Sequence, residues 1–146
     1  MSPAHSSSAE LGATVLRIAL GIMYLAHAAL KIFTFSMAGT VDFFVSVGFP
    51  PWTAYAVVSA ELAGGLLLIA GWRTREVALG LLPVLLGATA VHAPNGWVFN
   101  APGGGWEYPV FLIVASVVQA LLGAGAYALR WNPEDRSDGL IKGAVS

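Results

Sequence analysis

Four long apolar stretches dominate the pattern of hydrophobic and polar positions along this chain. They cover residues 11–35, 52–70, 75–93 and 106–129, and glycine, proline and charged residues gather in the segments between them. About 20 apolar residues in a helix cross the roughly 30 Å of hydrocarbon in a bilayer. The pattern therefore predicts an all-α integral membrane protein, folded as a bundle of four transmembrane helices.

The segments outside these stretches predict how the chain is organised. Residues 1–10 are expected to form a disordered polar N-terminus, residues 11–130 a single domain, and residues 131–146 a short cytoplasmic tail. The first stretch has no basic segment before it, and Arg17 interrupts what would be the apolar core of a signal peptide. We therefore interpret it as a membrane helix that is not cleaved.

The distribution of Lys and Arg between the connections predicts the orientation of the chain. Arg73 and Arg75 lie between the second and third stretches, and Arg130, Arg136 and Lys142 follow the fourth. The connection between the third and fourth stretches has neither residue type. Because short cytoplasmic loops of membrane proteins are enriched in Lys and Arg, both termini are expected to face the cytoplasm.

The composition supports a membrane location and excludes several kinds of site. Hydrophobic residues make up 57% of the chain and charged residues 10%, against about 25% charged in soluble domains. A net charge of −1 offers no basic surface for nucleic acid. Without cysteine there can be no disulfide, thiol chemistry or cysteine-ligated metal, and three histidines are too few to ligate several haems.

Polar side chains recur along one face of the first predicted helix. Arg17, Tyr24, His27 and Lys31 are separated by 7, 3 and 4 residues, which places them in one narrow stripe at helical spacing. Gly21 lies beside the stripe, where it would let a neighbouring helix approach closely. A polar stripe on a membrane helix is expected to face protein or water and not lipid.

Glu61 is a single acid within the apolar second stretch. A charge at membrane depth costs several kcal/mol unless it is paired or hydrated. Counting about 1.5 Å per residue from the cytoplasmic ends places Arg17 at about 9 Å and Glu61 at about 13 Å depth. These depths predict an Arg17–Glu61 ion pair, with Gly64 and Gly65 allowing the two helices to meet. Such a pair either only holds two helices together or forms part of a cofactor or proton site.

A second group of polar and aromatic residues is predicted near the outer surface. It comprises His27, Lys31, His92, Trp97, Asn100, Trp106 and Glu107. Each has an ordinary explanation, such as a lysine reaching the head groups or a tryptophan anchoring a helix at the interface. Together they place charges of both signs and two imidazoles at one depth, an arrangement that could bind a polar head group and move protons. A metal held by both histidines and Glu107 is a minor alternative.

The fourth stretch carries small and polar residues at helical spacing. These are Ser116, Gln119, Gly123 and Tyr127. Small residues and a single amide are typical of a packing seam between membrane helices, so we interpret this stripe as structural.

The order and spacing of these residues resemble those of DoxX family membrane proteins. The run RIALGIMYLAHAALKIF, residues 17–33, resembles the family's opening, with an Arg, a Gly four positions later and a His shortly before a Lys. The resemblance covers residues 11–130, and Ala28 departs from it where relatives often have Gly. Further matching positions are Gly48, Pro50, Glu61, Gly64, Gly65, Gly71, His92, Glu107, Gly123 and Gly125.

This resemblance implies a four-helix protein of the bacterial inner (cytoplasmic) membrane that is linked to quinone redox chemistry. The family that the chain resembles includes the small membrane subunit of a thiosulfate:quinone oxidoreductase. We therefore expect a subunit that binds a quinone and exchanges electrons and protons with a partner protein. The alternatives are a non-catalytic anchor for a redox or stress-response complex, and a small-solute or proton pathway.

The quinone hypothesis assigns roles to nine residues and no metal. The expected catalytic residues are Arg17, Glu61 and His92. The expected cofactor-binding residues are Tyr24, His27, Lys31, Asn100, Trp106 and Glu107. Because the sequence contains no evident redox centre, the chain is not expected to be a complete enzyme alone. Expected partners are the bilayer, a redox protein and further copies of the same chain.

Overall fold

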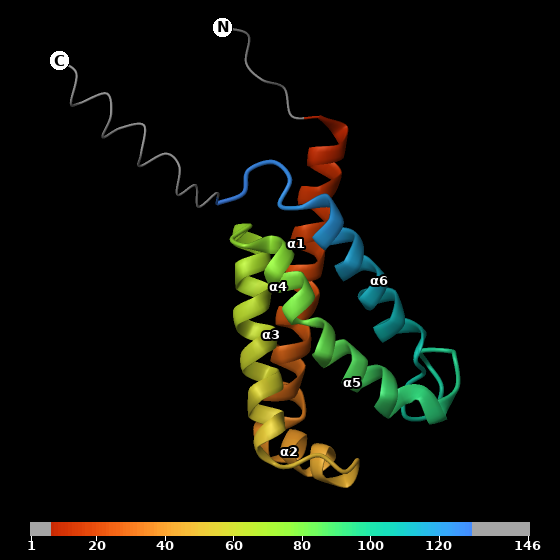
Figure 1. The fold of residues 1–146 in the computed structure, drawn as a ribbon. Coiled ribbons are helices and arrows are strands. Elements are labelled where there is room, and N and C mark those ends of the chain that lie inside the picture. The colour runs from red at the N-terminus through yellow and green to blue at the C-terminus, as the bar shows by residue number, and fades with distance from the viewer. Residues whose placement is uncertain (1–6, 130–146) are drawn as a thin grey trace, which may run out of the picture.

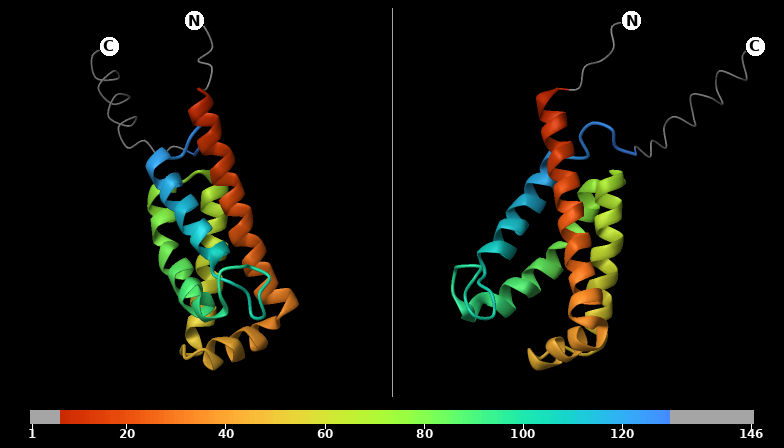
Figure 2. Two further views of the ribbon diagram at one scale, coloured as in Figure 1. Left: turned by 90° about the vertical axis from the view of Figure 1, so that its right-hand side faces the viewer. Right: turned by 180° about the vertical axis from the view of Figure 1, so that it is seen from behind.

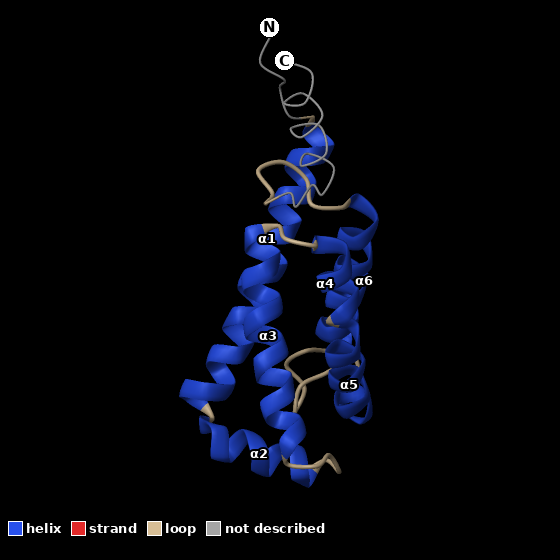
Figure 3. Ribbon diagram, turned by 60° about the vertical axis from the view of Figure 1, so that its left-hand side comes forward, coloured by secondary structure: helices blue, strands red, loops and turns tan. Residues whose placement is uncertain are grey.

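Helices form most of residues 7–129, the part of the chain that the computed structural model describes, and no strand occurs within that range (Figure 3). The α-helices are α1 (Ser8–Ala29), α2 (Ser36–Ser46), α3 (Trp52–Ala70), α4 (Thr74–Gly80), α5 (Leu82–His92) and α6 (Glu107–Leu122). A π-helical turn, η1 (Leu30–Thr34), follows α1, and a short 3₁₀ turn, η2 (Ala93–Asn95), follows α5. The all-α prediction is confirmed.

Three segments of the described chain are long and apolar enough to cross a membrane. They are Ser8–Thr34, Trp52–Ala70 and Thr74–Asn95, whereas α6 is a shorter apolar helix of 16 residues. This set is compatible with the predicted helical membrane bundle. The fourth predicted stretch, however, extended to residue 129. The helix ends at Leu122 because Gly123 has a φ of +82°, outside the right-handed helical region.

The early end of α6 also changes the predicted packing stripe. Ser116 and Gln119 are fully buried within α6, as a packing seam requires. Gly123 and Tyr127 lie beyond the helix, and the Tyr127 side chain is exposed. The stripe is therefore correct only for its first half.

The first helix begins earlier than predicted because its N-terminus is capped. Ser7 Oγ accepts a hydrogen bond from the Glu10 N–H, and the Glu10 carboxylate accepts one from the Ser7 N–H. This reciprocal capping box stabilises the first turn, so the helix starts at Ser8 and not at residue 11. Residues 7–10 are thus ordered, while the remaining N-terminal residues, 1–6, and the predicted tail lie outside the described range.

The third predicted helix is broken in its middle. Pro83 has no N–H to donate to the carbonyl oxygen of Leu79, and the chain bends at Leu81 between α4 and α5. After the bend, α4 remains against α3 and α6, whereas α5 packs chiefly on α6. Figure 1 shows α5 diverging from α3 as it descends.

An additional helix, α2, was not predicted. It begins at Ser36, which has a φ of +62°, and Ser36 Oγ accepts the Gly39 N–H in the first turn. Figures 1 and 2 show α2 lying across the end of α1 and α3. This end, with α2 and the loop of residues 96–106, is called the α2 end below.

Helices α1 and α3 pack antiparallel along most of their length (Figure 2). A Cβ atom added to Gly21 would lie 2.8 Å from the carbonyl oxygen of Gly65, and one added to Gly65 would lie 2.9 Å from that of Gly21. The two glycines therefore permit the close approach expected from the sequence, and they align residue 21 with residue 65. The surrounding core consists of Leu20, Tyr24, Leu68, Ala78, Leu81, Leu85, Leu112 and Ala115.

The opposite end of the bundle gathers three parts of the chain. The N–H of Ala126 donates to the Glu10 carbonyl oxygen at 3.2 Å, and the N–H of Leu129 donates to that of Ala70 at 3.0 Å. The start of α1, the α3–α4 turn with Arg73, and the segment after α6 thus lie together. This end is called the Arg73 end. Its arginines make it the expected cytoplasmic side.

Candidate functional site

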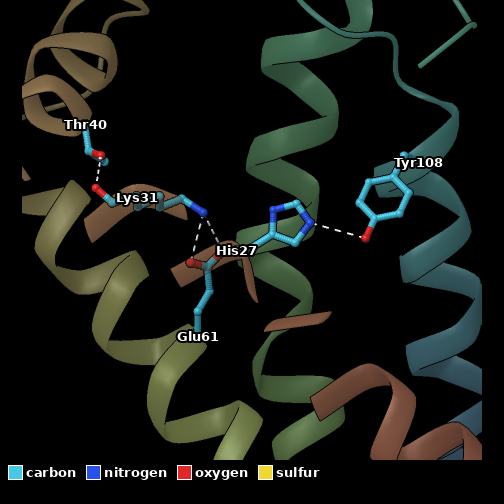
Figure 4. Close-up of polar contacts among 5 residues, drawn as sticks. All are labelled: His27, Lys31, Thr40, Glu61 and Tyr108. Atoms are coloured by element: carbon cyan, nitrogen blue, oxygen red, sulfur yellow. Dashed lines mark hydrogen bonds and ion pairs between the residues drawn. The ribbon is translucent and has the colours of Figure 1, made fainter. Parts of the chain in front are cut away.

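Glu61 forms its ion pair with Lys31, so the predicted pairing with Arg17 is wrong. The Lys31 Nζ donates to both carboxylate oxygens of Glu61, at 2.8 and 2.9 Å (Figure 4). The side chain of Glu61 is 6% exposed and that of Lys31 is 19% exposed. The acid in the apolar stretch is therefore compensated, as the cost of an isolated charge requires, but by a different cation.

The alignment of α1 with α3 explains why Lys31 is the partner. If residue 21 lies opposite residue 65 in an antiparallel pair, Glu61 lies opposite residue 25. Arg17 is eight residues away from that level, about 12 Å along the axis. Side chains also tilt toward the N-terminus of their own helix. Lys31 therefore leans back toward this level, Glu61 leans toward the α2 end, and Arg17 leans away.

Arg17 lies at the Arg73 end, next to the last turn of α3. Its side chain is 1% exposed, and Nη2 is 3.4 Å from the carbonyl oxygen of Ala126. Nε and Nη1 have no hydrogen-bond partner among the described residues. Gly71, the C-cap of α3, is so close that an added Cβ would clash with Nη1. The C-terminal end of a helix dipole favours a cation, so this position suits a structural arginine.

The depth count failed because α1 extends beyond α3 at the Arg73 end. The count took residue 11 as the start of the helix and as the edge of the bilayer. The Ser7 cap instead extends the helix outward, and Arg17 lies level with the end of α3. The positions of the polar residues along α1 and η1 were predicted correctly, but the register of α1 against α3 was not.

Lys31 is held by its backbone as well as by its ammonium group. It lies in the π turn η1, in which the Phe35 N–H donates to the Leu30 carbonyl oxygen at 2.9 Å. The Thr40 Oγ1 of α2 donates to the Lys31 carbonyl oxygen at 2.9 Å (Figure 4). Single π turns inside helices occur frequently at functional sites. Here the carbonyl oxygen of Lys31 is bonded to α2, and its ammonium group is bonded to α3.

His27 and Tyr108 form a second polar contact beside the ion pair. The His27 Nε2 lies 3.2 Å from the Tyr108 hydroxyl oxygen, and their ring centres are 5.5 Å apart. Figure 4 shows the His27 ring between the ion pair and Tyr108. Sequence reasoning did not select Tyr108. Its only signal was its place beside Glu107 at the start of a membrane helix, where a tyrosine is usually an interface anchor.

One cavity of about 430 Å³ brings most of the predicted site residues together. Five of the nine expected residues line it: Tyr24, His27, Lys31, Glu61 and His92. Tyr108 joins them from α6, and most of the remaining lining is apolar and comes from α2, α3 and α5. A volume in this range, with apolar walls and a few polar groups, is typical of small-molecule sites.

Tyr24 and His92 enter this cavity with defined hydrogen bonds. The hydroxyl of Tyr24 lies 3.4 Å from Ser116 Oγ on α6. The Nδ1 of His92 lies 3.0 and 3.2 Å from the carbonyl oxygens of Gly103 and Gly104. A carbonyl oxygen only accepts, so Nδ1 carries the hydrogen that these contacts require.

The other predicted loop residues lie outside the cavity. Glu107 accepts a hydrogen bond from the Phe99 N–H at 2.9 Å and lines a separate groove of about 470 Å³. The Trp106 ring packs edge-on against Trp97, with ring centres 4.5 Å apart. Asn100 is exposed in the turn. Glu107 and Trp106 therefore help to shape the loop, Glu107 through its bond to the Phe99 N–H and Trp106 through its contact with Trp97.

The alternative of a metal site is not supported by the placement of the acids and histidines. Within residues 7–129, no three His, Asp or Glu side chains lie close enough together to hold a metal ion. His27 and His92 share the cavity, but Glu107 lies in the other groove.

Comparisons with known proteins identify relatives of this chain. The DoxX family model matches residues 12–94, more than half of the chain. A protein of Bacillus subtilis (strain 168), named "Putative oxidoreductase CatD", is 34% identical over 125 residues, covering 85% of this chain and 88% of that protein. No solved structure matches this chain. The family match, together with the apolar helices of the chain, establishes that this chain is a membrane protein and belongs to the DoxX family.

Proposed function

We propose that this protein is the membrane subunit of a quinone-linked oxidoreductase in the inner membrane, and that its cavity binds the quinone head group. The family and the name of the Bacillus subtilis relative support a redox-related membrane protein. The observation that carries the finer proposal is the cavity, which combines an ammonium–carboxylate pair, two imidazoles and two phenols with apolar walls.

The polar groups of the cavity match the needs of a quinone. A quinone takes up two electrons and two protons at its carbonyl oxygens to become a quinol. Lys31 and Tyr108 can each donate a hydrogen bond to a carbonyl oxygen, and Glu61 orients the ammonium group through its two bonds. His27, bonded to Tyr108, can pass a proton along that contact.

The electrons must come from another protein in this proposal. The sequence holds no cysteine for an iron–sulfur cluster and too few histidines for several haems. The chain therefore binds the quinone and supplies protons, while a redox partner supplies the electron pair. Arg17 has no part in this step because it lies at the Arg73 end, beside Gly71.

Quinone binding to purified protein tests the proposal. Titration calorimetry would compare the wild type with Glu61→Gln, which keeps the shape of the side chain but removes the charge that orients Lys31. We expect binding to weaken about tenfold. The matched control is Glu76→Gln, since Glu76 is exposed and pairs with Arg73 at 3.4 Å, away from the cavity. An absence of binding by correctly folded wild-type protein would reject the proposal.

A non-catalytic anchor is the second candidate, and one observation favours it. The Lys31–Glu61 pair and the contact of Arg17 with the end of α3 both join α1 to α3, so these charges could serve packing alone. The variant Lys31→Met/Glu61→Leu separates the two functions, because apolar replacement of a buried pair is often neutral for stability. An anchor would still retain its partner proteins fully. A quinone-linked subunit would lose quinone-dependent activity in the complex.

A further inference from the structure

The tight packing between α3 and the third span ends at a defined level. On the Arg73 side, a Cβ added to Gly64 of α3 would lie 2.7 Å from the Leu81 side chain, so the helices are in close contact there. Beyond Leu81 the chain bends at Pro83, and α5 turns from α3 toward α6. Figure 1 shows the two helices separating below this point. The cavity begins where that contact ends, since Pro83, Val84 and Leu85 line it.

The two helices that border this part of the cavity present apolar and small side chains. Trp52, Ala56 and Val57 line it from α3, and Gly87 and Ala88 line it from α5. Trp52 is 67% exposed, and a Cβ added to Gly87 would meet no atom within 4 Å. Both helices belong to segments able to cross a membrane. The cavity therefore has an apolar opening that faces hydrocarbon when the chain is in a bilayer.

The side of the cavity toward the α2 end is covered by apolar residues, most of them aromatic. Phe43 and Phe44 of α2, with Val47 and Phe49 after it, contribute to the lining there. A ligand coming from water on this side would have to pass these apolar side chains. A ligand already dissolved in the bilayer would meet the apolar, partly exposed lining between α3 and α5.

We infer that the cavity receives its ligand laterally from the bilayer, and that the opening between α3 and α5 is a binding site for a hydrocarbon tail. Trp52, Ala56, Gly87 and Ala88 form this tail site, and the polar groups around Lys31 hold the head group. The inference rests on the proposed function, which provides the quinone head. It identifies the ligand as a quinone with a long hydrocarbon chain, as opposed to a small water-soluble quinone.

Two glycine variants test the tail site with a matched control. Gly87→Phe is chosen to place a ring in the opening, because a Cβ atom added at Gly87 would meet no atom within 4 Å. Gly80→Phe is the control, since Gly80 of α4 is equally open but does not line the cavity. Each variant, and the wild type, would be titrated with a long-tailed quinone and with the same head group lacking the tail.

The expected result separates the two ligands. The wild type should bind the tailed quinone at least tenfold more tightly than the bare head group. Gly87→Phe should weaken the tailed quinone at least tenfold and the bare head group no more than threefold, and Gly80→Phe should change neither. Equal weakening of both ligands by Gly87→Phe, or no weakening of either, would overturn the tail site. If the wild type binds neither quinone, the proposed function itself fails.

A labelling experiment on the wild type gives an answer even if Gly87→Phe does not fold. A tailed quinone with a photoreactive group in the middle of its tail would be bound to the protein in lipid nanodiscs and illuminated. The label is expected on the peptides that contain Ala56 or Gly87. A label confined to α2 or to residues 96–106 would show that the tail leaves toward water and would overturn the inference.

Discussion

Removing Lys31 alone should destabilise the protein, because it leaves a buried carboxylate without its cation. Glu61 accepts two hydrogen bonds from Lys31, and its side chain is 6% exposed. Breaking a buried pair by removing one partner costs roughly 3–5 kcal/mol. The side chain of Lys31 is 19% exposed, so water can replace part of the lost interaction. We therefore expect Lys31→Met to lower the free energy of unfolding by about 3 kcal/mol, a shift of about a hundredfold in the equilibrium.

Replacing both partners should restore most of this loss. In Lys31→Met/Glu61→Leu no charge is buried, and we expect a free energy of unfolding within about 1 kcal/mol of the wild type. The measurement is the unfolding transition of purified protein in mixed micelles, followed by helical circular dichroism, for the wild type, both single variants and the double variant. If the double variant is as unstable as the sum of the single variants, Lys31 and Glu61 are not coupled and the assigned pair is incorrect.

The same assay distinguishes this pair from the one that the sequence suggested. Arg17 and Glu61 share no partner within residues 7–129, and their effects should add to within about 0.5 kcal/mol. The double variant Arg17→Met/Glu61→Leu should thus be less stable than either of its single variants. Recovery of stability in this variant would support the Arg17–Glu61 pair and refute the register between α1 and α3.

Three further predictions concern other parts of the molecule. Gly71→Ala should lower the free energy of unfolding by about 2 kcal/mol, because the φ of +77° disfavours a side chain and the new Cβ would displace Arg17. Unchanged stability would contradict the packing at the Arg73 end. Tyr108→Phe should cost about 1 kcal/mol of stability, because the hydrogen bond to His27 is lost, and it should weaken quinone binding. If this variant binds the quinone as tightly as the wild type does, Tyr108 is not part of the site. Because the chain has no cysteine, the single variants Asn100→Cys and Arg73→Cys can each be labelled with an impermeant maleimide on intact cells. Only Asn100→Cys should react, because residue 100 is expected outside and residue 73 inside. Labelling at position 73 would reverse the predicted orientation.

The sequence was most informative where local chemistry determines the structure. The bounds of α3 agree with the predicted residues 52–70, because Pro50 and Pro51 precede the helix and Gly71, with a φ of +77°, ends it. The spacing of Tyr24, His27 and Lys31 likewise placed three side chains of one cavity on one face of the helical segment formed by α1 and η1. Helical periodicity alone was sufficient for that result.

The sequence was least informative about relations between helices. Which cation meets Glu61 depends on the register that the Gly21–Gly65 contact imposes, and a count from the helix ends carries no information on that contact. The contribution of Tyr108 depends on α6 approaching α1, which no local pattern indicates. The helix α2 was missed because its residues lie between two membrane stretches, in a segment that was read only as a connection.

The two cations of the predicted stripe, Arg17 of α1 and Lys31 of η1, have surroundings that give them different roles. Arg17 is enclosed by the end of α3 and by the segment after α6, with no room for even a Cβ atom at Gly71. Lys31 borders a cavity of about 430 Å³ and shares it with two imidazoles and two phenols. A charge can act on a ligand only where there is space for that ligand. The chemistry of this protein is therefore to be sought at the Lys31–Glu61 pair. The conservative variant Arg17→Lys should lower the free energy of unfolding more than it weakens quinone binding.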